Sequence, residues 1–171
     1  MGRRKKRDVV YLVVRRCDRK EPPHDYLKFY KVVRYWAKRK HGLTSPQIDM
    51  LLFLRSEYLF TRTAFNEYHN IFSWNSQEFD NLLRDGWIRQ FRKSAGAKHS
   101  LYELSGKAKR VVGEIYKKCN GESDFSTVPN KNPVFRRSDS NFADKTHAIQ
   151  MKKINKINRE KRLGTKKKKM I

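Results

Sequence analysis

The sequence predicts a mainly α-helical domain with a small β-hairpin, an α+β fold, between two basic and partly disordered extensions. Apolar residues recur at helical spacing through most of residues 25–121, and two short strand-like runs there flank a turn of small residues. The charge is also uneven. Of a net charge of +24, residues 1–20 hold nine Lys and Arg against two acids, and residues 131–171 hold fourteen against three. We therefore expect a basic extension over 1–24, a winged helix-turn-helix domain over 25–121, and a linker with a Lys-rich tail over 122–171.

The N-terminal extension is separated from the first helix by Glu21-Pro22-Pro23, which interrupts regular structure. Before this break, the β-branched run Asp8–Val14 favours a short strand, with a helical turn as the alternative. After it, Asp25 can cap a helix that should run to about His41, because Gly42 follows. The apolar stripe of this helix has spacings of three and four residues and consists of Tyr26, Phe29, Val33 and Trp36.

Three more helices are predicted before the hairpin. Thr44-Ser45-Pro46 combines capping residues with a proline suited to the first helical position, and it should start a second helix that ends near residues 56–58. A short third helix over about 62–69 follows. A fourth helix should begin at residue 74 or 75 and end at Arg84, before the stop signal Asp85-Gly86.

The hairpin and the last helix of the domain follow directly. Residues 87–92 and 100–104 are strand candidates, and the small residues from Ser94 to Ala97 form the turn between them. Ser105 then caps a helix that ends at Asn120-Gly121. Its predicted inner face consists of Ala108, Val111, Val112 and Ile115.

The composition changes after Glu122. Residues 122–141 are rich in Ser, Asp, Asn and Pro, which is typical of a linker. Residues 142–163 combine many lysines with scattered apolar positions. They are expected to be mobile alone and to form a helix only on a partner.

Enzyme, metal and membrane functions find no support in the sequence. Cys17 and Cys119 are far apart and have no C-x-x-C partner, and the five histidines and eight glycines form no metal or nucleotide motif. We therefore expect no enzyme, no cofactor and no metal. The apolar run at Val9–Val14 is too short for a secretory signal or a membrane span. The expected location is intracellular, in the cytoplasm or nucleoid, or in a virion if a virus encodes the chain.

The order of the predicted elements is that of a helix-turn-helix followed by a hairpin wing, an arrangement suited to DNA. Three segments also resemble the MarR-like winged-helix regulators: Leu43–Ile48, Leu82–Ile88 and Leu104–Ala108. The resemblance covers about residues 26–119, and it implies a DNA-binding transcriptional regulator that is usually a dimer.

The sequence departs from that family in its recognition helix, in its wing and in its C-terminal region. The predicted recognition helix carries Glu78 and Asp80 and a single basic residue, Arg84. The wing is short and lacks the family's usual acidic-then-basic tip. A linker and a basic tail stand where the family has its last dimerisation helix.

Candidate nucleic-acid contacts fall into three groups. On the fourth helix, Asn and Gln suit adenine edges, although the same residues could merely cap and solvate the helix. Around the wing, cations suit phosphate or minor-groove contacts, although an ordinary solvated hairpin would also carry them. The terminal runs suit non-specific phosphate binding. These candidates are Asn75, Ser76, Gln77, Asn81 and Arg84 on the helix; Arg89, Arg92, Lys93 and Lys98 on the wing; and Arg3, Arg4, Lys5, Lys6, Lys166, Lys167, Lys168 and Lys169 in the tails.

The three tryptophans are alternative candidates for contacts with single-stranded nucleic acid, since aromatic rings stack on unpaired bases. Trp36 and Trp87 fall on apolar periodicities and are expected in the core, while Trp74 is left open.

Two function classes remain. The first is a MarR-like regulator of transcription that binds double-stranded DNA, with a homodimer as one form it could take. The second is a structural or packaged protein of a virion or nucleoid, in which the winged helix docks on protein in a larger assembly and the tails contact the genome. RNA is a further candidate partner, because A-form helices also attract basic tails.

Overall fold

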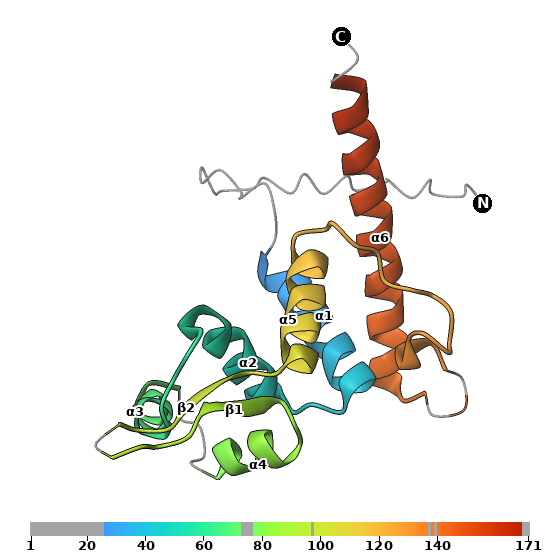
Figure 1. Cartoon of the computed structure of the whole chain (residues 1–171). Coiled ribbons are helices and arrows are strands. Elements are labelled where there is room, and N and C mark those ends of the chain that lie inside the picture. The colour runs from blue at the N-terminus through green and yellow to red at the C-terminus, as the bar shows by residue number, and fades with distance from the viewer. Residues whose placement is uncertain (1–25, 73–76, 97, 137, 139, 169–171) are drawn as a thin grey trace, which may run out of the picture.

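The structure is a computed structural model that describes residues 26–72, 77–96, 98–136, 138 and 140–168 (Figure 1). Its elements are, in chain order, α1 Tyr26–His41, α2 Ser45–Glu57, α3 Arg62–Phe72, α4 Glu78–Arg84, β1 Ile88–Arg92, β2 Leu101–Leu104, α5 Gly106–Cys119, the 3-10 helix η1 Pro133–Phe135, and α6 Phe142–Lys168. The fold is mainly helical with one small antiparallel sheet, as the sequence predicts. The strand predicted near the N-terminus lies outside the described residues.

Helix α1 lies at the centre of the packing and contacts α2, α5, α6 and η1. Its predicted stripe is buried at Phe29, Val33 and Trp36, but Tyr26 at its first turn is exposed. The prediction that Trp36 and Trp87 belong to the core is confirmed. Trp74 lies outside the described residues.

The second helix begins where the sequence predicts because two polar side chains satisfy its first backbone groups. Thr44 Oγ1 accepts a hydrogen bond from the N–H of Gln47 at 3.3 Å, and Gln47 Oε1 accepts one from the N–H of Thr44 at 3.0 Å. The buried face of α2 consists of Ile48, Met50, Leu51 and Leu54.

Helices α3 and α4 differ from the sequence prediction in their bounds. Helix α3 continues to Phe72 instead of ending near residue 69. Helix α4 is described from Glu78, and the predicted starts at residues 74 and 75 lie outside the described residues. Phe65 and Phe79 connect the two helices in the core, with ring centroids 5.1 Å apart.

The hairpin pairs Ile88 with Leu104 at its base, and its register shifts between Gln90 and Arg92. Phe60, in the connection between α2 and α3, pairs with Tyr102 of β2 through two backbone hydrogen bonds. A third segment of chain therefore joins the sheet at one residue. Beyond the hairpin, Ser105 caps α5 by accepting from the N–H of Ala108 at 3.2 Å.

Where the sequence predicts a linker and a tail that becomes helical only on a partner, the structure packs the described residues after 122 against the domain. Helix α6 runs for 27 residues, and Phe125, Val134, Met151 and Ile154 are buried in the same core as α1. Two buried amides in this region, those of Asn132 and Asn155, are hydrogen-bonded to backbone groups. Asn155 accepts from the N–H of Phe125 and donates to its carbonyl, both at 2.8 Å.

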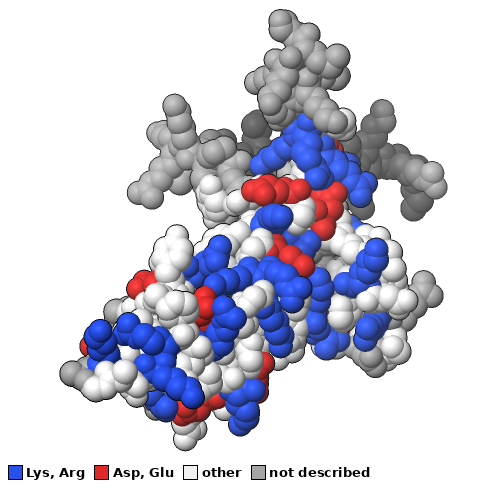
Figure 2. All heavy atoms as spheres, in the orientation of Figure 1, with Lys and Arg blue, Asp and Glu red and all other residues white. Residues whose placement is uncertain are grey.

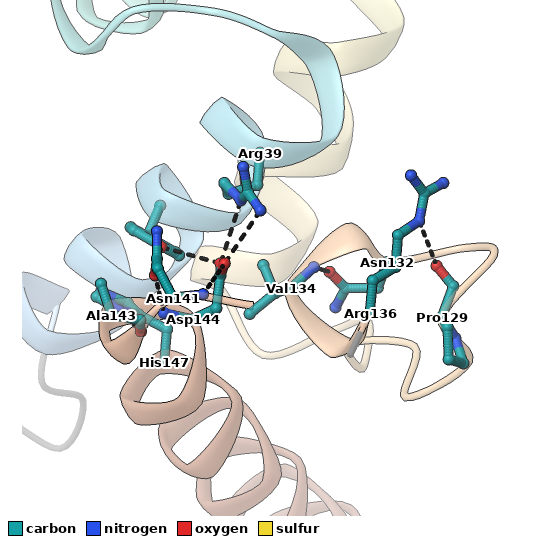
Figure 3. A network of polar contacts seen from close by, with 10 residues as sticks. Arg39, Pro129, Asn132, Val134, Arg136, Asn141, Ala143, Asp144 and His147 are labelled. Atoms are coloured by element: carbon teal, nitrogen blue, oxygen red, sulfur yellow. Dashed lines mark hydrogen bonds and ion pairs between the residues drawn. The ribbon is translucent and has the colours of Figure 1, made fainter. Parts of the chain in front are cut away.

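Helix α6 is held to α1 by a carboxylate with no exposed surface (Figure 3). Asp144 accepts hydrogen bonds from Arg39 at 3.1 and 3.0 Å and from the hydroxyl of Tyr35 at 2.9 Å. Asn141 and Asp144 also exchange hydrogen bonds between backbone and side chain, which closes the first turn of α6. Asn141 thus caps α6, and Asp144 both completes this cap and fixes the helix to α1.

A close approach at the other side of α6 requires a glycine. Gly121 has a φ of +76°, and a Cβ there would lie 2.7 Å from Oδ1 of Asn158. Glycine therefore allows both the left-handed turn after α5 and the contact with α6.

Candidate nucleic-acid interface

The hairpin carries three of the predicted contact residues as exposed side chains. Arg92 and Lys93 precede the turn, and Lys98 follows it, with a bridge between Ala95 and Lys98 and a φ of +57° at Gly96. Within the described residues, none of the three cations forms an ion pair. Their charge is therefore available to an external anion.

A polar hollow of about 440 Å³ separates the hairpin from the first turn of α3. Lys98 and His99 line it from the hairpin, and Thr61, Arg62 and Thr63 line it from the start of α3. The hydroxyl of Thr61 is engaged, since it accepts from the N–H of Ala64 at 3.0 Å. Cations and hydroxyls beside a helix N-terminus are the groups that bind phosphate oxygens.

Arg89, the fourth predicted contact on the hairpin, has a structural partner. Its Nε and Nη2 donate to Glu103 at 2.9 and 2.7 Å, and Lys109 of α5 donates to the other carboxylate oxygen. Hydrogen bonds from Lys109 and then Arg89 lower the pKa of the Glu103 carboxyl. Arg89 therefore shares the single negative charge of Glu103 with Lys109, and its own charge is only partly compensated.

Helix α4 presents more negative than positive charge. Glu78 accepts from Gln47 at 3.1 Å, and Asp80 pairs with Arg62 at 2.5 Å. Arg84, the only cation of α4, lies 3.4 Å from Asp85. Carboxylates on this helix oppose a close approach to phosphates, although a carboxylate can accept from a cytosine amino group.

The other predicted contacts on α4 differ in how accessible they are. Gln77 is exposed just before the helix, and Asn81 is half-buried within it. Asn75 and Ser76 lie outside the described residues.

Of the predicted tail contacts, those that the structure describes are not brought to the hairpin. Lys166, Lys167 and Lys168 form the last turn of α6, and Figure 1 shows this end of the helix on the opposite side of the molecule from the hairpin. Arg3, Arg4, Lys5, Lys6 and Lys169 lie outside the described residues.

Sequence reasoning missed a basic face over α5. Lys107, Arg110 and Lys117 are exposed on this helix, and Figure 2 shows Lys and Arg gathered over α5 between the hairpin and α6. The sequence spacing of these three residues could have predicted this face, because positions three and seven residues apart share one side of a helix.

The chain matches no family model, no curated protein and no solved structure. The resemblance to MarR-like regulators therefore stays a prediction from the residues quoted above. In the part of the chain that the structure describes, no helix combines the length and apolar content that crossing a membrane requires.

Proposed function

We propose that the protein is a non-enzymatic winged helix-turn-helix protein that binds double-stranded DNA, as a MarR-like regulator would. The supporting arrangement is α2, the bridged residue Phe60, α3, α4, the hairpin and α5, in that order. The observation that carries the proposal is the group of three exposed hairpin cations beside the polar hollow at α3. Such a wing contacts the DNA backbone while the preceding helix lies in a groove.

The charges of α4 indicate how DNA is contacted. Phosphate contacts from the hairpin position a protein on the duplex, whereas base contacts from a recognition helix give sequence preference. Here the hairpin is basic, and α4 carries Glu78 and Asp80. We therefore expect most of the affinity to come from phosphate contacts and to fall with salt, and any sequence preference to come from the few contacts that α4 can make to base edges.

The experiment is fluorescence anisotropy of a random duplex of about 30 base pairs, titrated with the full chain over a salt series. Replacing Arg92, Lys93 and Lys98 with Ala should reduce the log–log salt slope by about 2.7, or 0.9 for each phosphate that is no longer neutralised. The matched control replaces Lys28, Lys31 and Lys38 of α1, which are also exposed. An equal loss in both variants would contradict the proposal, because net charge alone would then explain binding.

A structural or packaging role is the second candidate, and the acidic α4 is the observation that favours it. Selection from a random duplex library separates the two roles. Enrichment of a defined site supports a regulator. Binding at similar affinity with no enriched site supports a protein that coats a genome.

A further inference from the structure

A second basic site lies in a cleft that the hairpin does not touch. The cleft has a volume of about 490 Å³, and three separate parts of the chain form it: the end of α1, the second half of α5, and residues 123–131. Trp36 lines it together with four lysines: Lys40, Lys117, Lys118 and Lys131.

Lys118 brings a buried ammonium group to this cleft. Only 8% of the residue is exposed, and its Nζ donates to the carbonyl of Asp124 at 2.8 Å. The ammonium also lies 4.8 Å from the ring centre of Trp36 and 4.9 Å from that of Phe125. Aromatic faces stabilise a cation at such distances, but burial still lowers the pKa of Lys118.

The carboxylates at the cleft do not balance its lysines. Glu114 pairs with Lys40 at 3.0 Å. The carboxylate of Asp124 is directed to α6, where it pairs with Arg162 at 2.6 Å and with Arg159 at 3.6 Å. Within the described residues, Lys117 and Lys131 are exposed and form no ion pair, so the cleft keeps an excess of positive charge.

We propose that this lysine cleft binds phosphate groups, and that its occupant is the backbone of the nucleic acid bound by the hairpin. The proposal rests on the proposed function. Phosphate is favoured because four lysines and two serines line the cleft, and because its two carboxylates, Glu114 and Asp124, are already paired with basic side chains. A backbone is favoured over a small ion because basic side chains continue over α5 from the cleft toward the hairpin (Figure 2).

The first test replaces the two exposed lysines by Lys117→Glu and Lys131→Glu in the full chain. The control is Lys31→Glu with Lys38→Glu, which makes the same charge change on α1 at about 160–180° around the helix from Lys40. Duplex affinity should fall at least tenfold in the cleft variant, and the salt slope by about 1.8. Equal losses in the two variants would overturn the proposal.

The second test locates the contact directly. Lysines of the free and the duplex-bound chain are modified with an amine-reactive reagent and quantified by mass spectrometry. Protection of Lys117 and Lys131 together with Lys93 and Lys98 supports the cleft. Protection of Lys93 and Lys98 alone overturns the cleft and leaves the proposed function intact.

The same labelling separates the remaining outcomes. If the duplex does not bind and no lysine is protected, the proposed function fails and the backbone occupant fails with it. A parallel arm uses pyrophosphate in place of the duplex. Protection of Lys117 and Lys131 by pyrophosphate but not by the duplex would overturn the backbone as occupant, since the cleft would then serve a small phosphate ligand.

Discussion

Glu103 connects the hairpin to α5 through two cations. Arg89 is the residue of β1 that pairs with Glu103 of β2, and Lys109 lies in the first turn of α5. The residue is 8% exposed, and both of its carboxylate oxygens accept charged hydrogen bonds. A carboxyl group in this setting favours its ionised form, so its pKa lies below the ordinary value.

Replacing Glu103 with Gln should lower the free energy of unfolding by about 1 kcal/mol at pH 7, since both cationic partners are substantially exposed. A lowered pKa means that the contribution is present above the ordinary pKa of Glu and is lost as pH falls through the folded-state value. Urea unfolding from pH 7 to about pH 3 should show the two proteins converging in acid. A constant difference would contradict this account.

Cys119 should be chemically inert in the folded protein. Burial raises the pKa of its thiol to about 11. Only the thiolate reacts with iodoacetamide, and at pH 8 roughly one thiol in a thousand would be ionised. In a Cys17→Ser variant, alkylation followed by mass spectrometry should be far slower than for glutathione and should become fast in urea. Labelling at the glutathione rate without denaturant would show that the thiol is not protected.

At the scale of elements, local signals account for the helices that the sequence predicts. The starts of α2 and α5 depend on Thr44, Gln47 and Ser105, whose partners lie three residues away. Helix α6 depends on Phe125, 30 residues distant from Asn155. The composition of the region after residue 122 therefore predicts a tail. It shows that apolar residues are few, but it does not show that distant segments pack on them.

The same distinction applies to the candidate site. The hairpin cations are predictable because they surround a single turn. The cleft is not, since Lys40, Lys118 and Lys131 come from three segments that only the tertiary fold brings together.

Asp144→Ala should weaken the attachment of α6. The variant removes the carboxylate that accepts from Arg39 and Tyr35 and the reciprocal hydrogen bond to the N–H of Asn141, while the Asn141 cap on the N–H of residue 144 remains. We expect a loss of about 2 kcal/mol in the free energy of unfolding. Urea unfolding measures the loss, and amide hydrogen exchange should show faster exchange at Met151 and Ile154. Glu160→Gln is the control on the same helix. Its pair with Lys156 is exposed and 4.0 Å long, so it should contribute less than about 0.5 kcal/mol. Similar effects from the two variants would refute a special role for Asp144.

At the scale of the whole molecule, α6 is part of the domain and also carries much of its charge. Residues 142–168 hold ten Lys and Arg against two acids. A chain cut at residue 122 would therefore lose charge and core together, because Trp36 packs against Phe125 and the buried Met151 and Ile154 belong to the same cluster. Weaker DNA binding by that fragment would not show which loss was responsible.

Two truncations separate charge from core. Ending the chain after Leu163, which is 63% exposed, keeps the contacts of Arg162 with Asp124 and removes the four lysines 166–169. Its thermal unfolding should match that of the full chain, and its salt slope should fall by up to about 3.6 if all four lysines contact phosphates.

Ending the chain after Glu122 should cost more than about 3 kcal/mol of stability, because apolar surface around Trp36 becomes exposed. A red shift in tryptophan emission, with lower stability in urea, would report that exposure. If this shorter chain were as stable as the full one, α6 would not contribute to the stability of the domain. Its lysines could then be removed without disturbing the fold.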